Sequence, residues 1–169
     1  MAVIRLDNLS WGFASKCFVC EPSNDAGLRI PFFHDEEAGM VCAESTLDER
    51  FSGAPSYVHG GMTLAILDEA MAWATIAVSK SFALTHRTTT TFVRPVKVDR
   101  PYRVEARISQ TAEQSDDGNI TVSASILRGT DGTPCAEAEA VFVPLSAAQA
   151  TDALGTDICG SPDAGYLTR

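Results

Sequence analysis

The chain has 169 residues, 45% of them hydrophobic, with 22 acidic residues against 13 basic ones. A net charge of -9 without any basic run excludes a nucleic-acid-binding face and a polybasic membrane anchor. No apolar run reaches transmembrane length, and the first residues lack the apolar core of a secretory signal, so no membrane partner and a cytoplasmic location are expected.

Three segments follow one another along the chain. Residues 1–37 predict an N-terminal extension, a short helix or loop followed by a strand near 28–33. Residues 38–145 hold the long helix and most strands, and they form the expected folded domain. Residues 146–169 are small and polar and predict a flexible tail, because they cannot bury enough apolar surface to offset chain entropy.

The extension contains a Cys17-x-x-Cys20 pair. This spacing can hold a metal ion, with His34 or Cys42 as further ligands. No second cysteine pair follows at the spacing of a zinc finger, so we favour two small buried thiols beside Phe18 and expect no metal. The five cysteines are an odd number without the density of a disulfide scaffold, which agrees with a reducing compartment.

The central segment alternates strands with one long helix. A strand is expected at 40–46, and a glycine- and proline-containing turn at 53–56 leads into a helix at about 61–79. The helix is apolar all round, which predicts that it is buried. A threonine-rich run at 82–94, closed by Pro95, predicts a long strand.

Three further segments, 102–108, 120–126 and 136–142, alternate apolar and polar residues. Asp-Gly pairs at 117–118 and 131–132 mark turns between them. These features predict an antiparallel meander. The expected fold class is α+β, one helix packed against one antiparallel sheet.

Two adjacent acids, Asp68 and Glu69, interrupt the apolar helix. A buried carboxylate is costly unless it is paired, neutralised or used in chemistry. Neighbouring residues on a helix point about 100° apart, so the two acids cannot share one environment. One can reach a cleft, while the other bonds to the sheet or to a partner subunit.

A His59-Gly60-Gly61 sequence begins the helix. The first N–H groups of a helix lack intrahelical partners and lie at the positive end of its dipole. They can bind a phosphate, a carboxylate or the oxyanion of an acyl-transfer intermediate. Equally, the glycines can simply allow a close backbone neighbour.

These features together resemble the hotdog-fold acyl-CoA thioesterases, and most of all their PaaI-like branch. The resemblance is carried by His59-Gly60-Gly61-x6-Asp68, the long helix, the strand ending Phe92-Val93-Arg94-Pro95, the meander closing on Phe142-Val143-Pro144, and the Cys17-Phe-x-Cys20 and Gly27-Leu28 opening. It implies a hotdog fold, with a sheet wrapped around the central helix and continued across a homodimer. Active sites would lie at the subunit interface, and two dimers often form a tetramer.

The resemblance also implies hydrolysis of an acyl-CoA, with CoA as part of the substrate and no separate cofactor. Gly60 would donate its N–H to the oxyanion, and Asp68 would be the general base or the nucleophile. Thr85, typically from the opposite subunit, would help to place the water or the carboxylate. His59 would shape the loop and Gly61 would contact substrate. A carboxylate among apolar residues binds protons more tightly, which suits a base near neutral pH.

Two features leave alternatives open. Some relatives carry Asn or Gln about six residues before the histidine, where it helps to hold the water, and here that residue is Gly53. A non-catalytic acyl-CoA-binding or interaction module is therefore the second hypothesis. Glu69 is a rival base, but spacing and helix phase favour Asp68. The hydratase branch of this fold is set aside, because it requires a histidine where Trp73 stands.

Basic residues near the end of the long strand are the expected partners of the coenzyme phosphates. We assign Arg94 to substrate binding, because arginine binds phosphate through bidentate contacts. Lys97, Arg87 and Arg128 are further candidates.

Overall fold

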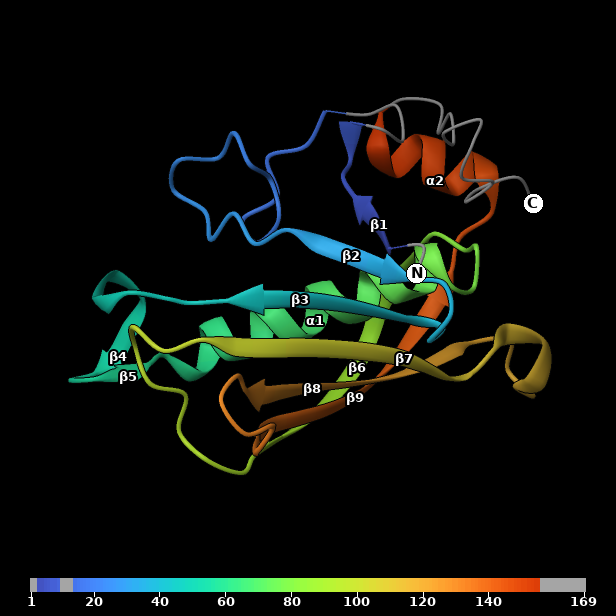
Figure 1. The fold of residues 1–169 in the computed structure, drawn as a ribbon. Helices are drawn as coiled ribbons and strands as arrows, with labels where there is room; N and C mark the ends of the chain where they lie inside the picture. Colours follow the sequence, from blue (N-terminus) through green and yellow to red (C-terminus); the bar gives the residue numbers. More distant parts are fainter. Residues whose placement is uncertain (1–2, 10–13, 156–169) are drawn as a thin grey trace.

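The computed structural model describes residues 3–9 and 14–155 (Figure 1). Its strands are β1 (Val3–Leu6), β2 (Phe32–Asp35), β3 (Met40–Ser45), β4 (Ser52–Ala54), β5 (Tyr57–Val58), β6 (Ala83–Phe92), β7 (Tyr102–Gln110), β8 (Ile120–Arg128) and β9 (Pro134–Pro144). Its α-helices are α1 (Gly60–Ala77) and α2 (Ala147–Leu154), and short 3-10 helices lie at Glu49–Phe51 and Ala112–Gln114. None of the described helices is both long enough and apolar enough to cross a membrane.

Seven strands form one antiparallel sheet in the order β1-β2-β3-β7-β8-β9-β6, and β4 and β5 pair separately. The sheet curves around α1, as Figure 1 shows. Leu67, Ala70, Met71 and Ala74 of α1 are fully buried against it. The apolar circumference of the helix is thus explained by the sheet that surrounds it. The predicted α+β class and the hotdog arrangement of one long helix against an antiparallel sheet are confirmed.

The predicted meander is also confirmed. β7 pairs with β8 and β8 with β9, both antiparallel. Every second side chain faces the helix and is buried, including Val104, Val122, Ala124 and Ala140. The alternation read from the sequence therefore identifies the buried face of the sheet.

β6 contains an irregularity that the sequence did not reveal. Thr85 pairs with Phe142 of β9 and Arg87 with Val141, so His86 is one extra residue in the strand. Such a bulge shifts the alternation of side chains by one position. β6 forms one edge of the sheet. Because of the bulge, the side chains before His86 point to the opposite side of the sheet from the one that unbroken alternation along β6 would give.

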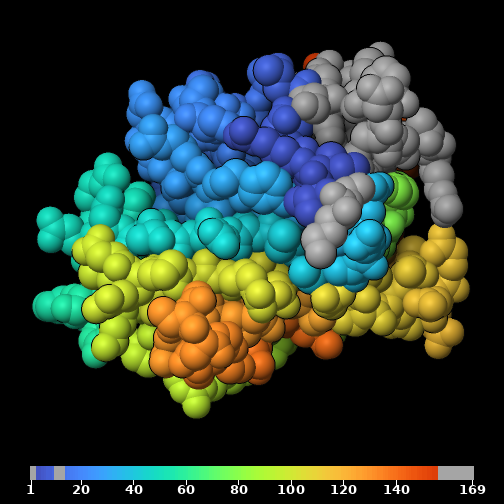
Figure 2. Space-filling model, in the orientation of Figure 1, coloured from blue at the N-terminus to red at the C-terminus, as the bar shows by residue number. Residues whose placement is uncertain are grey.

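The N-terminal segment adds two strands to the opposite side of the same sheet. β1 pairs with β2, and β2 with β3. The expected strand near 28–33 begins only at Phe32, and β1 was not predicted. In Figure 2 this segment, in blue, lies along the strands coloured cyan and makes one continuous surface with them.

The segment after β9 differs from the flexible tail that we predicted. It begins with α2, whose N-terminus has a capping box in which the Ser146 side chain accepts from the Gln149 N–H and the Gln149 side chain from the Ser146 N–H. Ala150 of this helix is only 2% exposed. The capped first turn and this buried contact compensate for the small apolar content. The rest of the predicted tail, residues 156–169, lies outside the described residues.

Candidate functional site

Asp68 and Thr85 form a hydrogen-bonded pair between α1 and the edge strand β6. Thr85 Oγ1 donates to Asp68 Oδ1 at 2.9 Å. The bulge after Thr85 turns this hydroxyl toward the helix, on the side of the sheet where Thr88 and Thr90 also bury their hydroxyl oxygens. The contact lies within one chain, whereas the resemblance implied a hydroxyl from the opposite subunit. Asp68 is thus oriented by its own chain.

The start of α1 is organised by His59. Its ring Nδ1 accepts a hydrogen bond from the Gly61 N–H at 2.9 Å, and its carbonyl accepts from the Met62 N–H at the same distance. In a neutral ring that accepts through Nδ1, the proton lies on Nε2. The Gly61 N–H is therefore already bonded, and the backbone donor left at this helix start is that of Gly60.

Gly53 stands where some relatives have an amide side chain. A Cβ atom built at this residue would lie 2.9 Å from Cδ2 of His59 and 3.0 Å from its Cα. Any side chain here would collide with the histidine. The missing water ligand is therefore linked to the way His59 packs at the helix start.

Gly60 and Asp68 of the same chain are too far apart to act on one bond. They are eight residues apart on a continuous helix, which corresponds to about 12 Å along its axis. A reacting carbonyl must lie within about 3 Å of both the oxyanion donor and the attacking atom. If both residues act on one thioester, they must therefore come from different chains.

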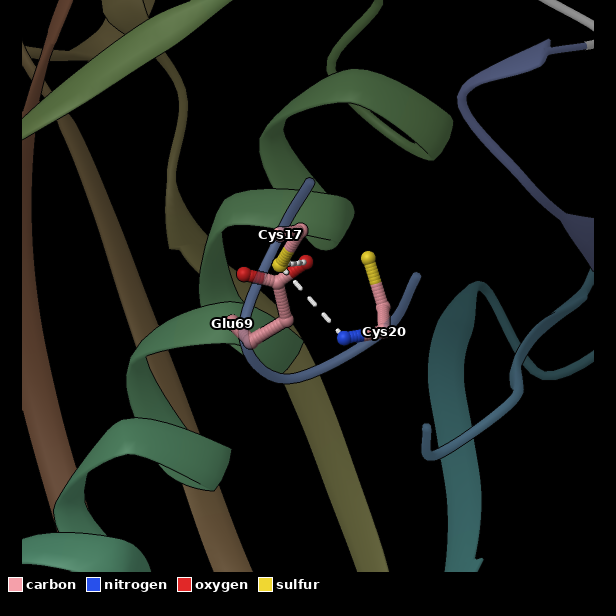
Figure 3. Close-up of side chains that lie close together, drawn as sticks. All are labelled: Cys17, Cys20 and Glu69. Carbon is pink, nitrogen blue, oxygen red and sulfur yellow. Dashed lines mark hydrogen bonds between the residues drawn. The ribbon is translucent and has the colours of Figure 1, made fainter. Parts of the chain in front are cut away.

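Glu69 points toward the N-terminal loop that carries Cys17 and Cys20, as Figure 3 shows. Its Oε1 is 3.4 Å from the Sγ of Cys17, and the two groups share a hydrogen bond. Burial and the nearby Cys17 and Asp68 charges raise the pKa of Glu69 to about 8. A carboxyl with this pKa is mostly protonated at neutral pH, so Glu69 is poorly suited to be the base.

The two cysteines differ in their affinity for a proton. The Cys20 side chain and the N–H groups of Cys20 and Val19 lower the pKa of Cys17 to about 5. The Cys17 side chain and burial raise the pKa of Cys20. The expected buried thiol is found for Cys20, whereas Cys17 is only half-buried and Phe18 is 41% exposed. His34 and Cys42 do not belong to this cluster.

A cavity of about 240 Å³ lies beside Thr85 and Glu69. Its walls are mostly apolar and come from α1, the start of β6, the N-terminal segment and α2: they include Trp73, Ile76, Phe82, Leu84, Cys17 and Leu154. Both the extension and the helix after β9 therefore help to close it. A mostly apolar cavity next to a few polar groups is the usual form of a small-molecule site.

Arg94, which we assigned to a phosphate, is exposed just after β6, and this assignment stays a prediction. Its Nη1 donates to the backbone oxygen of Pro134 at 3.0 Å. A separate hollow of about 330 Å³ gathers three cations, Lys97, Arg100 and Arg128. Arg100 was not foreseen from the sequence, because only the fold brings it beside the other two.

Residues 56–133 match the model of the thioesterase superfamily. Among solved structures, a thioesterase superfamily protein superposes with a TM-score of 0.65 and 25% identity, over 72% of this chain and 57% of its own. The E. coli PaaI protein from the phenylacetic acid degradation operon gives a TM-score of 0.56 and 17% identity, over 64% of this chain and 74% of its own. A Streptococcus mutans protein bound to acetyl CoA gives a TM-score of 0.56 and 12% identity, over 64% of this chain and 82% of its own. No curated protein matches the sequence.

Residues 56–133 thus resemble the thioesterase superfamily, and the sheet wrapped around α1 is the hotdog fold that the solved structures of this superfamily share. PaaI is among the structural neighbours of this chain, so the resemblance read from the sequence is confirmed. The chain spans 57% of the length of the first structural relative.

Sequence reasoning missed several parts of the cavity. Asn8, Cys17 and Leu154 line it although they lie far from the helix in sequence. The Ser146-x-x-Gln149 pattern was a readable signal for α2, because it is a capping box. No local signal marks Asn8.

Proposed function

We propose that this protein hydrolyses an acyl-CoA thioester to a free acid and CoA. The observation that carries the proposal is the Asp68 and Thr85 pair, 2.9 Å between oxygens, at the border of the apolar cavity. The family match and the structural relative that holds acetyl CoA support the substrate class. The free thiols of four described cysteines support a cytoplasmic location.

In this proposal Asp68 is the general base. Thr85 holds Oδ1, so the second carboxylate oxygen is left to accept a proton from water as the water attacks the thioester carbonyl. The Gly60 N–H stabilises the oxyanion, and the intermediate then expels the CoA thiolate. Glu69, bonded to Cys17, takes no part in proton abstraction.

A second copy of the chain supplies the missing half of each site. β6 is an edge strand, and Leu84 and Phe92 near its two ends are 52% and 55% exposed. If two copies of β6 pair antiparallel about its centre, Thr85 lies opposite residue 90 of the second copy, two residues from Phe92 of that copy. The Phe92 ring adjoins Gly60, with Cζ 3.6 Å from where a Cβ would be. A homodimer therefore brings Gly60 of one chain to Asp68 of the other, and two dimers can form a tetramer.

The substrate would lie along this interface. The acyl group enters the cavity beside Trp73 and Phe82, whose aromatic rings suit an aromatic or medium-length chain. The phosphates of CoA bind the hollow lined by Lys97, Arg100 and Arg128, where Arg128 also pairs with Asp131 at 3.2 Å.

The test is release of free thiol from a panel of aromatic and medium-chain acyl-CoAs. Asp68→Asn keeps the shape of the side chain but removes the base, so we expect kcat to fall about 100-fold or more with acyl-CoA binding retained. Asp116→Asn, an exposed acid in the β7–β8 connection, is the control and should keep full activity. Equal activity of Asp68→Asn and the unmodified protein would refute the assignment.

A non-catalytic acyl-CoA-binding protein is the second candidate, and Gly53 favours it. No amide side chain can hold the water there, because His59 occupies the space. This alternative predicts that acyl-CoA binds, by calorimetry, while no thiol is released from any member of the panel. Turnover that disappears in Asp68→Asn with binding intact would exclude it.

A further inference from the structure

Three side chains of the kinds that bind metal ions meet where the N-terminal loop packs against α1. The Sγ atoms of Cys17 and Cys20 and a carboxylate oxygen of Glu69 all lie within 4.8 Å of one another. The Cys17 Sγ and Glu69 Oε1 are 3.4 Å apart. Two ligands on one tetrahedral zinc ion are separated by about 3.6 Å for sulfur and oxygen and about 3.8 Å for two sulfurs, from the usual bond lengths. The three donors are therefore spaced for a common ion (Figure 3).

The turn between the cysteines is shaped around the sulfur of Cys17. The N–H groups of Val19 and Cys20 both donate to this Sγ, at 3.3 and 3.4 Å. The Asn8 amide donates to the Sγ of Cys20 at 3.7 Å. Donors directed at sulfur stabilise a thiolate, the form that binds metal, and such outer contacts orient metal ligands.

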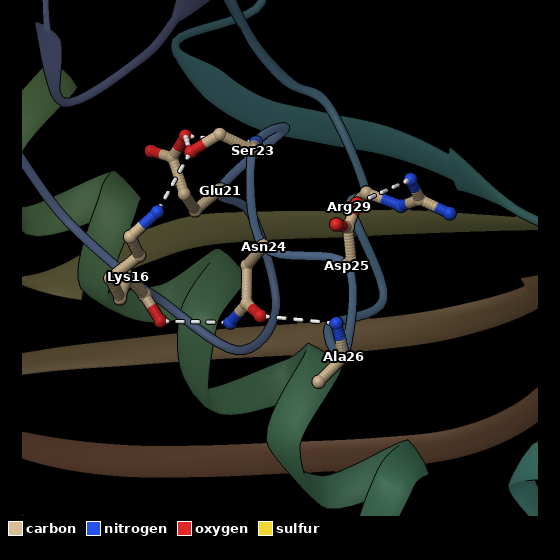
Figure 4. Close-up of polar contacts among 7 residues, drawn as sticks. All are labelled: Lys16, Glu21, Ser23, Asn24, Asp25, Ala26 and Arg29. Atoms are coloured by element: carbon tan, nitrogen blue, oxygen red, sulfur yellow. Dashed lines mark hydrogen bonds and ion pairs between the residues drawn. The ribbon is translucent and has the colours of Figure 1, made fainter.

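The loop that carries the cysteines is held rigid by its own contacts, shown in Figure 4. The Asn24 side chain accepts from the Ala26 N–H and donates to the Lys16 carbonyl. Backbone bonds from Leu28 N–H to Phe18 O and from Ile30 N–H to Val19 O, 2.7 and 2.9 Å, fix the turn itself. A preformed pair of ligands loses less entropy when it binds an ion.

The cluster lacks a protein cation. Within residues 3–9 and 14–155, the structure shows no ion pair to Glu69, and its side chain hydrogen-bonds to the side chains of Cys17 and Cys20. Anionic groups removed from water need protons or a positive ion as partners. A metal ion is the partner that satisfies all three donors at once.

We propose that Cys17, Cys20 and Glu69 bind one zinc-like divalent ion. Two thiolates with one carboxylate suit zinc rather than magnesium or calcium, which prefer oxygen alone. Cys17 and Glu69 also line the 240 Å³ cavity, so the fourth position opens toward it and holds water. The ion ties the N-terminal loop to α1 one residue from Asp68. This proposal does not depend on the hydrolase function.

The first experiment measures bound zinc. The full chain, purified without chelator and under reducing conditions, should contain about one zinc per chain by mass spectrometry of the metal, as expected for one tetrahedral site. Cys17→Ser and Glu69→Gln should each lose most of this zinc. Cys42→Ser, a half-buried thiol on β3 outside the cluster, should keep it.

The second experiment tests the ligands directly and does not rely on variants that fold poorly. Chelator-treated protein is titrated with Co²⁺, and a sulfur-to-cobalt charge-transfer band with strong tetrahedral bands should appear at one equivalent. Zn²⁺ should raise the melting temperature of the same sample by about 5 to 10 °C at saturating concentration. Glu69→Gln, similar in shape, should show neither change.

Three results would overturn the proposal. The first is reduced protein that binds neither Zn²⁺ nor Co²⁺. The second is zinc content unchanged in both Cys17→Ser and Glu69→Gln. The third is a Cys17–Cys20 disulfide, found by peptide mass spectrometry of protein handled with thiols blocked, together with no metal after reduction.

Discussion

At the scale of residues, the two adjacent acids of α1 have separate surroundings. Asp68 accepts a hydrogen bond from Thr85 on the edge strand, and Glu69 shares one with Cys17 on the N-terminal loop. The helix phase predicted this separation, because one residue turns the side chain by about 100°. Which acid faces which partner depended on the fold, since the sequence contains no information about where the loop and the strand pack.

Thr85 is expected to act through Asp68. Thr85→Ala removes the hydroxyl that orients the carboxylate, so kcat for acyl-CoA hydrolysis should fall about 10- to 100-fold with little change in KM. Thr85→Ser keeps the hydroxyl and should recover most of the rate. Thr121→Ala on β8 is the control for loss of a strand threonine. A large rise in KM with unchanged kcat would indicate that Thr85 binds substrate instead.

At the scale of elements, the loop between β1 and β2 requires a glycine. Gly27 passes so close to Phe18 that a Cβ atom would be 2.5 Å from the Phe18 carbonyl oxygen. That oxygen accepts the Leu28 N–H at 2.7 Å, which holds the cysteine turn. The Gly27-Leu28 pattern noted in the sequence thus has a steric cause.

Gly27→Ala should therefore destabilise the protein. The added methyl group must push the loop from the Phe18 carbonyl, and we expect the free energy of unfolding to fall by about 1 to 3 kcal/mol, as for other overpacked sites. Denaturant unfolding followed by circular dichroism measures the difference. Ala26→Ser, at an exposed neighbouring residue, should change stability by less than about 0.5 kcal/mol. Equal stability of both variants would contradict the steric explanation.

At the scale of the whole molecule, each proposed site combines two chains. Gly60→Pro removes the proposed oxyanion donor, which is one half of the site. Proline at the first helical position lacks only an N–H that the helix does not use, so the helix itself should be kept. The backbone of His59, at φ -59° and ψ 134°, already suits a residue before proline. Asp68→Asn removes the proposed general base, which is the other half of the site.

Mixing the two inactive variants tests the composite site. Chains are unfolded together in equal amounts and refolded, and half of the resulting dimers are mixed. Each mixed dimer contains one intact site if Gly60 and Asp68 come from different chains, so about one quarter of the unmodified activity should return for a twofold dimer. No recovery, in a sample shown by native mass spectrometry to contain mixed dimers, would place both residues in one chain's site.

Much of the fold could be predicted because its signals are local. The apolar helix, the alternating strands at 102–108, 120–126 and 136–142, and the spacing from Gly60 to Asp68 are all visible in short windows of sequence. The domain limits, the dimer and the roles of the site residues remain predictions. The extra strand β1 and helix α2 were missed, since each is short and gains its stability from packing against the sheet or core.

The sequence by itself determined the fold class and the helix that carries the two acids, because hydrophobic period and residue spacing follow directly from backbone geometry. Only the tertiary structure decided the partners of those acids. The extra residue His86 turns Thr85 toward Asp68, and the folded loop brings Cys17 and Cys20 to Glu69. Such contacts join residues distant in sequence, and their positions are set by how the sheet, the loop and the helix pack together.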